Sequence, residues 1–237
     1  MKKVTPIYFF LFVFLTCAAF LTKDTSNDCV LYFPWEKGTE FELRNYDKKG
    51  KLANIAIHKV TESKREGNTA SVKANFEFFE KENDPEYFAS GDYSVKCEDG
   101  VFHFEFGQIN PMGNTGQMRN VEMDIESDFL DIPANPQAGQ TLNGGKMVIR
   151  FGAGDMNLMK STATISNRKV AAVEKRTTPA GTFDCIKITY DTEVKMLIKA
   201  KGSAAEWYAK DVGLVRSESY DKKGRLIGYT ELHRISK

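Results

Sequence analysis

Hydrophobic and polar residues alternate with a period of two along most of this chain. Residues 71–78 read SVKANFEF and residues 101–106 read VFHFEF, so aliphatic or aromatic side chains occupy every second position. Residues 121–129, VEMDIESDF, place apolar side chains on one side and carboxylates on the other. This period is typical of β-strands that are half-buried in an antiparallel sheet.

Further stretches fit strands, and Gly, Asp, Asn or Pro separates most of them. They are Thr39–Tyr46, Lys51–Glu62, Gly91–Cys97, Lys146–Phe151, Met159–Arg176, Thr182–Val194, Lys195–Lys201, Ala204–Lys210, Gly213–Tyr220 and Arg225–Ile235. No long stretch carries a helical stripe, so we expect helices to be few and short, with one around Lys81–Phe88. The pattern predicts an all-β fold, a large antiparallel sheet curved into a half-barrel or open barrel.

One phrase occurs twice, as NYDKKGKL at residues 45–52 and as SYDKKGRL at residues 219–226. In both copies an alternating strand precedes Asp-Lys-Lys-Gly and another follows it. Asp47 and Asp221 can accept hydrogen bonds from the turn backbone, and the glycine can adopt the positive φ of a turn with a bulge. We interpret both copies as hairpin turns that open and close one domain.

The first residues are typical of an export signal. Lys2 and Lys3 precede the apolar run 7–15, IYFFLFVFL, which is too short to span a bilayer comfortably. The signal peptide is expected to cover about residues 1–22, with a small-residue cleavage site before Phe20, and residues 23–237 are expected to form a single β domain. Two alternatives stay open: a lipoprotein signal that ends at Cys17, and an uncleaved anchor.

The overall charge gives no sign of an electrostatic partner. The chain has 33 Lys and Arg against 32 Asp and Glu, a formal net charge of +1. A balance this even disfavours nucleic acid and anionic membrane surfaces as partners. No transmembrane span is expected after the signal.

Three cysteines remain once the signal is removed, in a compartment that is expected to be oxidising. A Cys29–Cys97 disulfide is the economical pairing, because it would fix the start of the domain to the end of a strand. Cys185 lies in a strand-like run and is expected to be a buried thiol.

Three segments resemble a known family. They are CVLYFPWEKGTEFELRNYDKKGKL at 29–52, EKRTTPAGTFDCIKITY at 174–190 and AEWYAKDVGLVRSESYDKKGRL at 205–226. They are similar to the TapB-like, or domain-of-unknown-function 3108-like, exported proteins of Gram-negative bacteria, although Lys175 and Arg176 stand where a small or apolar residue is commoner. The resemblance implies a curved sheet in the style of periplasmic lipoprotein carriers, and it implies no catalytic residues.

Few residues suggest chemistry. His58, His103 and His233 lie in no metal-binding spacing, and no cofactor motif is complete. The acidic row contains weak calcium candidates, Asp124, Glu126 and Asp128, but a solvated strand face explains it more simply.

We therefore predict a non-enzymatic protein of the periplasm or outer membrane that binds a lipid, acyl chain, peptide or partner protein in the concavity of its sheet. The alternatives are a structural or interaction module of the envelope and, more remotely, a hydrolase. Residues 108–145 are rich in Gly, Asn and Pro and include methionines that could form a flap over the pocket. The candidate ligand-binding residues are Met112, Met118, Phe76, Phe78, Phe102, Phe104 and Trp207.

Overall fold

The structure is a computed structural model of the 237-residue chain, and it describes residues 29–84, 86–111, 122–127, 131–153, 156–196 and 198–237. Within these ranges the named secondary-structure elements are all β-strands, as the period of two predicts. The strands are β1 (Glu40–Asp47), β2 (Leu52–Glu66), β3 (Thr69–Phe79), β4 (Ala89–Glu98), β5 (Val101–Pro111), β6 (Glu122–Ser127), β7 (Ile132–Pro133), β8 (Gly145–Ala153), β9 (Met156–Thr178), β10 (Gly181–Lys195), β11 (Lys199–Ala209), β12 (Gly213–Asp221) and β13 (Leu226–Ser236).

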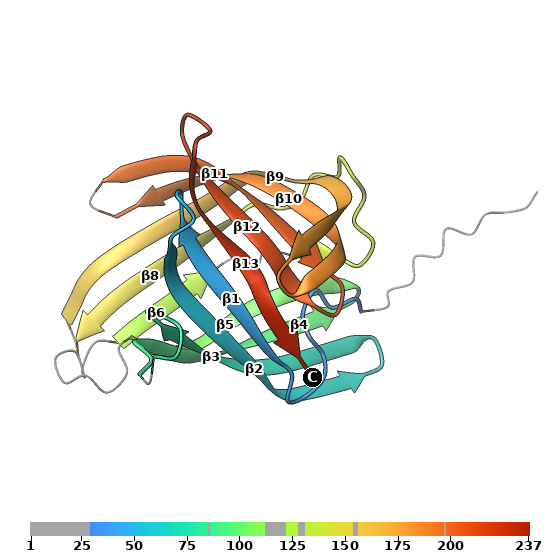
Figure 1. The fold of residues 1–237 in the computed structure, drawn as a ribbon. Coiled ribbons are helices and arrows are strands. Elements are labelled where there is room, and N and C mark those ends of the chain that lie inside the picture. Colours follow the sequence, from blue (N-terminus) through green and yellow to red (C-terminus); the bar gives the residue numbers. More distant parts are fainter. Residues whose placement is uncertain (1–28, 85, 112–121, 128–130, 154–155, 197) are drawn as a thin grey trace, which may run out of the picture.

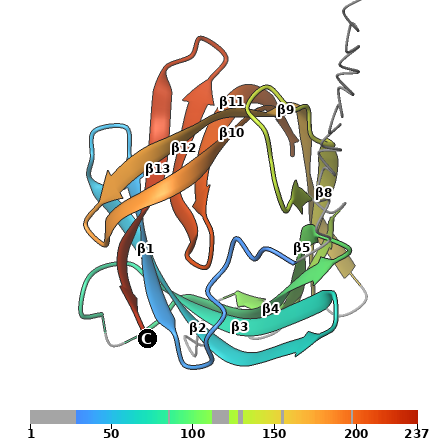
Figure 2. The same cartoon turned by 90° about the vertical axis from the view of Figure 1, so that its right-hand side faces the viewer.

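The strands form one antiparallel sheet that curls strongly around an interior (Figures 1 and 2). Their order across the sheet is β4-β3-β2-β1-β13-β12-β11-β10-β9-β8-β6-β5-β7, and β4 also pairs with β5. In the described residues, β5 meets β6 through one residue pair, Ile109 opposite Met123. The fold is therefore the curved half-barrel sheet that the sequence predicts.

The burial of β3 shows how the period of two builds this fold. Alternate side chains point to the inside and are buried, while Lys73 and Glu77 between them are exposed. Val72 faces Val95 of the neighbouring β4, and neither side chain is more than 1% exposed. Burying an aliphatic side chain of this size contributes about 1.5–3 kcal/mol. The inner face of the sheet is thus the main core of the protein.

The two repeated phrases form hairpin turns in neighbouring hairpins. One joins β1 to β2, the other joins β12 to β13, and β1 pairs directly with β13. In each turn one carboxylate oxygen of Asp47 or Asp221 accepts two backbone N–H groups, at 2.8 and 2.9 Å or at 2.8 and 3.0 Å. Gly50 and Gly224 have φ of 79° and 72°, a region that glycine adopts without steric cost. The two copies therefore form the turns of the first and last hairpins in the sequence, as expected.

Residues 29–39 run through the inside of the curled sheet (Figure 2). Leu31, Tyr32 and Phe33 in this N-terminal segment are 1%, 2% and 4% exposed. The backbone N–H of Asp211 donates to the carbonyl of Leu31 at 2.9 Å, which ties the segment to the β11–β12 turn. The domain therefore fills part of its own concavity with residues 29–39.

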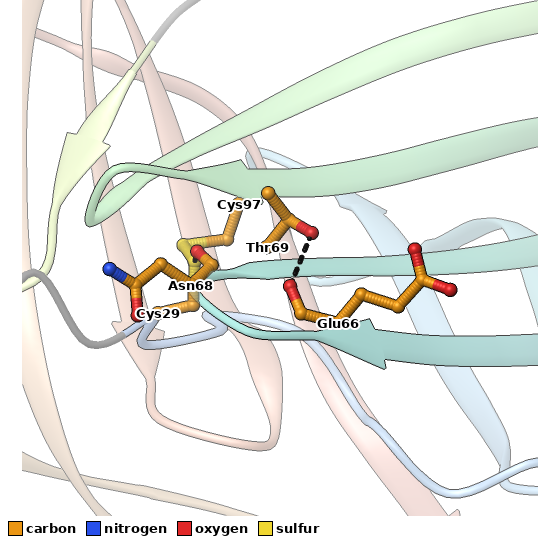
Figure 3. Close-up of a disulfide and its surroundings, with 5 residues drawn as sticks. All are labelled: Cys29, Glu66, Asn68, Thr69 and Cys97. Atoms are coloured by element: carbon orange, nitrogen blue, oxygen red, sulfur yellow. Dashed lines mark hydrogen bonds between the residues drawn. A yellow bond between two sulfur atoms is a disulfide. The ribbon is translucent and has the colours of Figure 1, made fainter.

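A disulfide fixes the start of the N-terminal segment (Figure 3). It joins Cys29 to Cys97 at the end of β4, the pairing that the sequence predicts, with the two Cα atoms 5.5 Å apart. The β2–β3 turn lies beside it, where the Thr69 hydroxyl donates to the Glu66 carbonyl at 2.8 Å. Cys185 is a buried free thiol, as expected.

Two expectations about local structure are wrong. Residues 81–84 and 86–88 form turns and bends of the β3–β4 connection, not a helix. Asn83 has a left-handed φ of 58°, and the N–H of Phe88 donates to the carbonyl of Phe78 at 2.8 Å, which closes a hairpin. Lys195–Lys201 is not a separate strand, because β10 ends at Lys195 and β11 begins at Lys199 in the same hairpin.

Candidate functional site

A cavity of about 270 Å³ lies inside the curled sheet, against the N-terminal segment. The residues that line it come from the segment and from strands all around the sheet. They are Tyr32, Phe33, Phe41, Leu43, His58, Tyr93, Phe102, Phe104, Ile132, Gly145, Lys146, Met147, Ile165, Arg168, Glu206, Tyr208 and Leu214. Curling brings these positions together from distant parts of the sequence.

One end of the cavity is a cluster of aromatic rings. Phe33 packs edge-on against Phe41, Tyr93 and Phe104, with ring centroids 5.5, 5.7 and 6.4 Å apart. Tyr93 and Phe104 stack at 4.9 Å. Such ring pairs are favourable beyond the area they bury, so this end is both apolar and well ordered by packing. We call it the aromatic end.

His58 belongs to the aromatic end. Its ring stacks on Phe41 with centroids 4.7 Å apart, and its Nδ1 lies 2.9 Å from the hydroxyl of Tyr93. Burial lowers the pKa of His58 to about 4. The imidazole is therefore neutral at physiological pH and contributes an uncharged ring to the wall.

The other end of the cavity carries charge. Arg168, on β9, is 4% exposed, and its Nη1 donates to the carbonyl oxygens of Asp131 at 2.7 Å and Asn143 at 3.4 Å. Burial lowers the pKa of Arg168, while the charges of Glu206 and Asp131 act in the opposite direction. A guanidinium keeps its proton in proteins, so this end contains a buried positive charge.

Glu206, on β11, provides the carboxylate of the same end. Its Oε1 accepts a hydrogen bond from the Tyr190 hydroxyl at 2.7 Å, and its Oε2 accepts one from the Tyr208 hydroxyl at 3.0 Å. Burial, and then the charge of Glu206, raises the pKa of both tyrosines, so both hydroxyls stay protonated as donors. We call Arg168, Glu206 and Tyr208 the polar end.

Tyr32 of the N-terminal segment also lines the cavity. Its ring lies 6.3 Å from that of Phe102, Phe102 pairs with Ile132, and the carbonyl of the adjacent Asp131 binds Arg168. The Tyr32 hydroxyl is buried and has no hydrogen-bond partner among the described residues. Burial raises the pKa of Tyr32 to about 12, so it keeps its proton.

The predicted ligand-binding residues lie at different places. Phe102 and Phe104 line the cavity. Phe76 is in the core behind it, with its ring 6.0 Å from that of His58, and Phe78 packs against Phe76 at the edge of that core. Met112 and Met118 lie outside the described residues.

Trp207 does not line the cavity. It is 2% exposed and belongs to a second, smaller core with Cys185 and Val215. Its Nε1 donates to Glu174 Oε1 at 2.6 Å, and Arg176 lies 4.6 Å over its ring. Arg176, which departs from the family pattern, therefore covers this tryptophan. The neighbour Tyr208 lines the cavity, because successive residues of a strand point to opposite faces.

The weak calcium candidates of the acidic row stay a prediction, because the described part of the chain does not include their side chains. No group of three His, Cys, Asp or Glu there is arranged to hold a metal ion. Asp124 and Glu126 fall on β6, where Arg150 of β8 stands opposite Asp124 in the register, and Asp128 lies outside the described residues.

Sequence reasoning missed the polar end. Arg168 and Glu206 are far apart in the sequence, and nothing in either strand marks them as neighbours. The N-terminal aromatics had a weak sign, since Leu31, Tyr32 and Phe33 form an apolar run ahead of the first predicted strand. Such a run just ahead of a sheet is a candidate for internal packing.

Fold and cavity together define an all-β half-barrel protein with an apolar, aromatic-lined interior. The DUF3108-like family matches residues 36–232, and the chain belongs to this family. No curated protein sequence is similar enough to the chain to count as a relative. The part of the chain that is described has no helix long and apolar enough to cross a membrane.

Two solved structures resemble the chain. In both cases the similarity covers 88% of this chain and the whole of the other chain. One, from Bacteroides fragilis, is described as a "putative exported protein with YmcC-like fold", with 26% identity and a TM-score of 0.75. The other, from Parabacteroides distasonis, is described as a "putative lipoprotein", with 27% identity and a TM-score of 0.74. Both descriptions are consistent with a place in the cell envelope.

Proposed function

We propose that this protein is an exported, non-enzymatic protein of the periplasm or outer membrane that binds one small apolar ligand inside its curled sheet. The aromatic-lined cavity carries this proposal. Small-molecule sites are typically concave, mostly apolar and equipped with a few polar groups that fix orientation. The aromatic end and the polar end supply these two parts.

The volume of the cavity limits the ligand. A protein cavity of about 150 Å³ can hold one benzene molecule, so the 270 Å³ found here would hold about eleven non-hydrogen atoms. A whole phospholipid is much larger than this. A single acyl chain, or one apolar group of a larger molecule or peptide, fits the space.

The chemistry of the wall supports binding without reaction. Among the described residues, the lining includes no serine, threonine or cysteine that could act as a nucleophile. His58 is neutral and bound to Tyr93, and Glu206 accepts hydrogen bonds from two tyrosines. The hydrogen bonds of His58 and Glu206 with these tyrosines stabilise the wall.

Native mass spectrometry of protein purified from the envelope of its own host tests the proposal. We expect an additional non-covalent mass that is released on denaturation. Leu43→Trp, which fills the cavity, should abolish it, whereas Ile227→Trp, at a 54% exposed position, should keep it. A ligand-free wild type, or an equal adduct on Leu43→Trp, would overturn the proposal and favour an interaction module of the envelope.

A further inference from the structure

Charge is distributed unevenly over this nearly neutral chain. Three hairpin ends each combine three cations with one carboxylate: the β1–β2 turn (47–51), the end of the β10–β11 hairpin (193–196 and 198–201) and the β12–β13 turn (221–225). The cations are Lys48, Lys49 and Lys51 in the first, Lys195, Lys199 and Lys201 in the second, and Lys222, Lys223 and Arg225 in the third. All of these cations are exposed, and we call the three hairpin ends the basic tips.

The sheet places the basic tips next to one another at one of its ends. Neighbouring strands are antiparallel and follow the order β2-β1-β13-β12-β11-β10, so these three hairpins turn at the same end (Figure 1). Asp47 in the first tip pairs with Gly228, which closely follows the third tip. Asp221 in the third tip pairs with Gly202, which directly follows the second. The cations therefore lie along one edge of the molecule.

The turns at the opposite end of the sheet carry the opposite charge. They connect β2 with β3, β4 with β5, β9 with β10 and β11 with β12, and their charged residues are Glu66, Glu98, Asp99, Lys210 and Asp211. The β3–β4 connection lies at the same end as the basic tips but beyond β2, and it is acidic as well, with Glu80, Glu82, Asp84 and Glu86 against Lys81. The basic surface is therefore confined to the three neighbouring tips.

The second basic tip also exposes large apolar side chains. Val194, Met196 and Ile198 are 37%, 45% and 81% exposed, and Ile198 is the most exposed large apolar side chain in the described part of the chain. Ile227, which closely follows the third tip, is 54% exposed. Apolar side chains that gather on a surface in this way mark a binding surface.

The β10–β11 hairpin carries these side chains beyond the neighbouring strand β12. β10 and β11 pair as far as Lys195 opposite Lys199, whereas β11 and β12 pair only as far as Gly202 opposite Asp221. The second tip therefore extends past the end of β12 and can enter a surface that the other two tips touch.

The carboxylates of the basic tips leave most of the positive charge uncompensated. Glu193 pairs with Lys199 at 2.7 Å and with Lys201 at 3.6 Å, and Asp221 pairs with Arg225 at 2.6 Å. Ion pairs between exposed side chains are weak. With three cations and one carboxylate, each tip keeps a net positive charge.

Cations around exposed aliphatic side chains fit a bilayer that contains anionic phospholipids. The headgroups attract lysines, and aliphatic side chains gain free energy by leaving water for the boundary between headgroups and acyl chains. A soluble polyanion would bind the lysines but leave Met196 and Ile198 in water. The even charge of the whole chain does not oppose this partner, because salt screens charges that lie more than about 8–10 Å away.

We propose that the basic tips dock this protein on the anionic phospholipid surface of a bilayer, with Met196 and Ile198 inserted between the headgroups. The lysines of the three tips hold the protein on the surface and set its orientation. The docking site consists of exposed hairpin ends, so the inference is independent of the cavity and of its ligand.

Flotation with phospholipid vesicles tests the inference. The protein is residues 23–237, which include every described residue, exported behind a cleavable signal peptide so that the disulfide forms and no acyl group is attached. We expect vesicles of phosphatidylcholine with about one third phosphatidylglycerol to bind the protein at least about tenfold more tightly than phosphatidylcholine alone. This binding should weaken steeply between about 50 and 500 mM NaCl.

The contribution of the cations is tested with Lys222→Gln/Lys223→Gln. This double variant should bind the mixed vesicles about 25-fold more weakly, because each lysine near an anionic surface contributes about fivefold. The matched control, Lys37→Gln/Lys210→Gln, removes two exposed lysines at the opposite end of the sheet and should bind as the wild type does. Equal weakening by both double variants would show that only net charge matters and would overturn the inference.

The contribution of the apolar side chains is tested with Ile198→Ser. It should weaken binding to the mixed vesicles by about tenfold, because an aliphatic side chain no longer leaves water. Val173→Ser is the matched control, since Val173 is 62% exposed but stands opposite Ile186, far along β9 from the second tip. Unchanged binding of Ile198→Ser would overturn the bilayer as the partner and favour a soluble polyanion. Equal binding of the wild type to both kinds of vesicle, or to neither, would overturn the docking site itself.

Discussion

The disulfide between Cys29 and Cys97 should make a large contribution to the stability of the domain. It closes a loop across a sequence separation of 68 residues and fixes the N-terminal segment inside the sheet. In the chain-entropy treatment a loop of this length stabilises the folded state by about 4 kcal/mol, because the crosslink restricts the unfolded chain. The perturbation is the double variant Cys29→Ala/Cys97→Ala.

Urea unfolding measures the effect. We expect the double variant to lose about 4 kcal/mol relative to the oxidised wild type. The reducing agent TCEP should lower the stability of the wild type by a similar amount and leave the double variant unchanged, which controls for effects of the reductant. Because Tyr32 and Phe33 follow Cys29 closely and line the cavity, binding of decanol should weaken in parallel. A double variant within about 1 kcal/mol of the wild type would refute the reasoning.

Three further predictions concern single side chains. Tyr32→Phe should raise the free energy of unfolding of the ligand-free protein by about 1 kcal/mol in urea, because it removes a buried hydroxyl without a partner in the described residues; a clear loss of stability would contradict this. The pKa of His58 is lowered by burial to about 4, so as the pH falls from 6.5 towards 4 the unfolded chain binds a proton that the folded chain does not. Stability should then fall by about 3 kcal/mol, and His58→Phe should lack this part of the pH dependence in urea titrations at pH 7 and 4.5; identical profiles would argue against the assignment. Arg176→Ala should cost about 1–2 kcal/mol and shift tryptophan fluorescence, because Arg176 lies over Trp207 and its Nη2 donates to Glu218 at 3.1 Å; unchanged fluorescence would show that this contact is absent in solution.

The sequence predicted the fold class well because strand alternation is a local property. In β3 and β4 each buried position follows from its parity in the strand, and the turns at Asp47 and Asp221 follow from their residue types. The disulfide could be predicted for a different reason, because few pairings exist among three cysteines.

The expectations about local structure were wrong where the pairing of strands, and not the local sequence pattern, determines the structure. Residues 195–201, KMLIKAK, contain an apolar run and no Gly, Pro or Asn, so nothing in the sequence marks the turn between β10 and β11. Residues 81–88 have no strand alternation, and the pairing of β3 with β4 makes the described residues 81–84 and 86–88 part of a hairpin loop.

The candidate site was only half predictable. Phe102 and Phe104 follow from alternation, which says that they point inward. Trp207 and Tyr208 must point to opposite faces, but alternation alone does not say which face is the inside at β11. That Arg168, Glu206 and Tyr32 line one cavity depends on the curl of the whole sheet and on the path of the N-terminal segment, neither of which is encoded in a local pattern.

The most direct test of the central claim is methyl NMR of the delipidated protein during titration with decanol. We predict that chemical-shift changes concentrate on the methyl groups of Leu43, Ile132, Ile165 and Leu214, which line the cavity. The exposed Val173, Ile198 and Ile227 should change little. Changes centred on these exposed residues, or no changes at all up to the solubility limit of decanol, would contradict a ligand site inside the sheet.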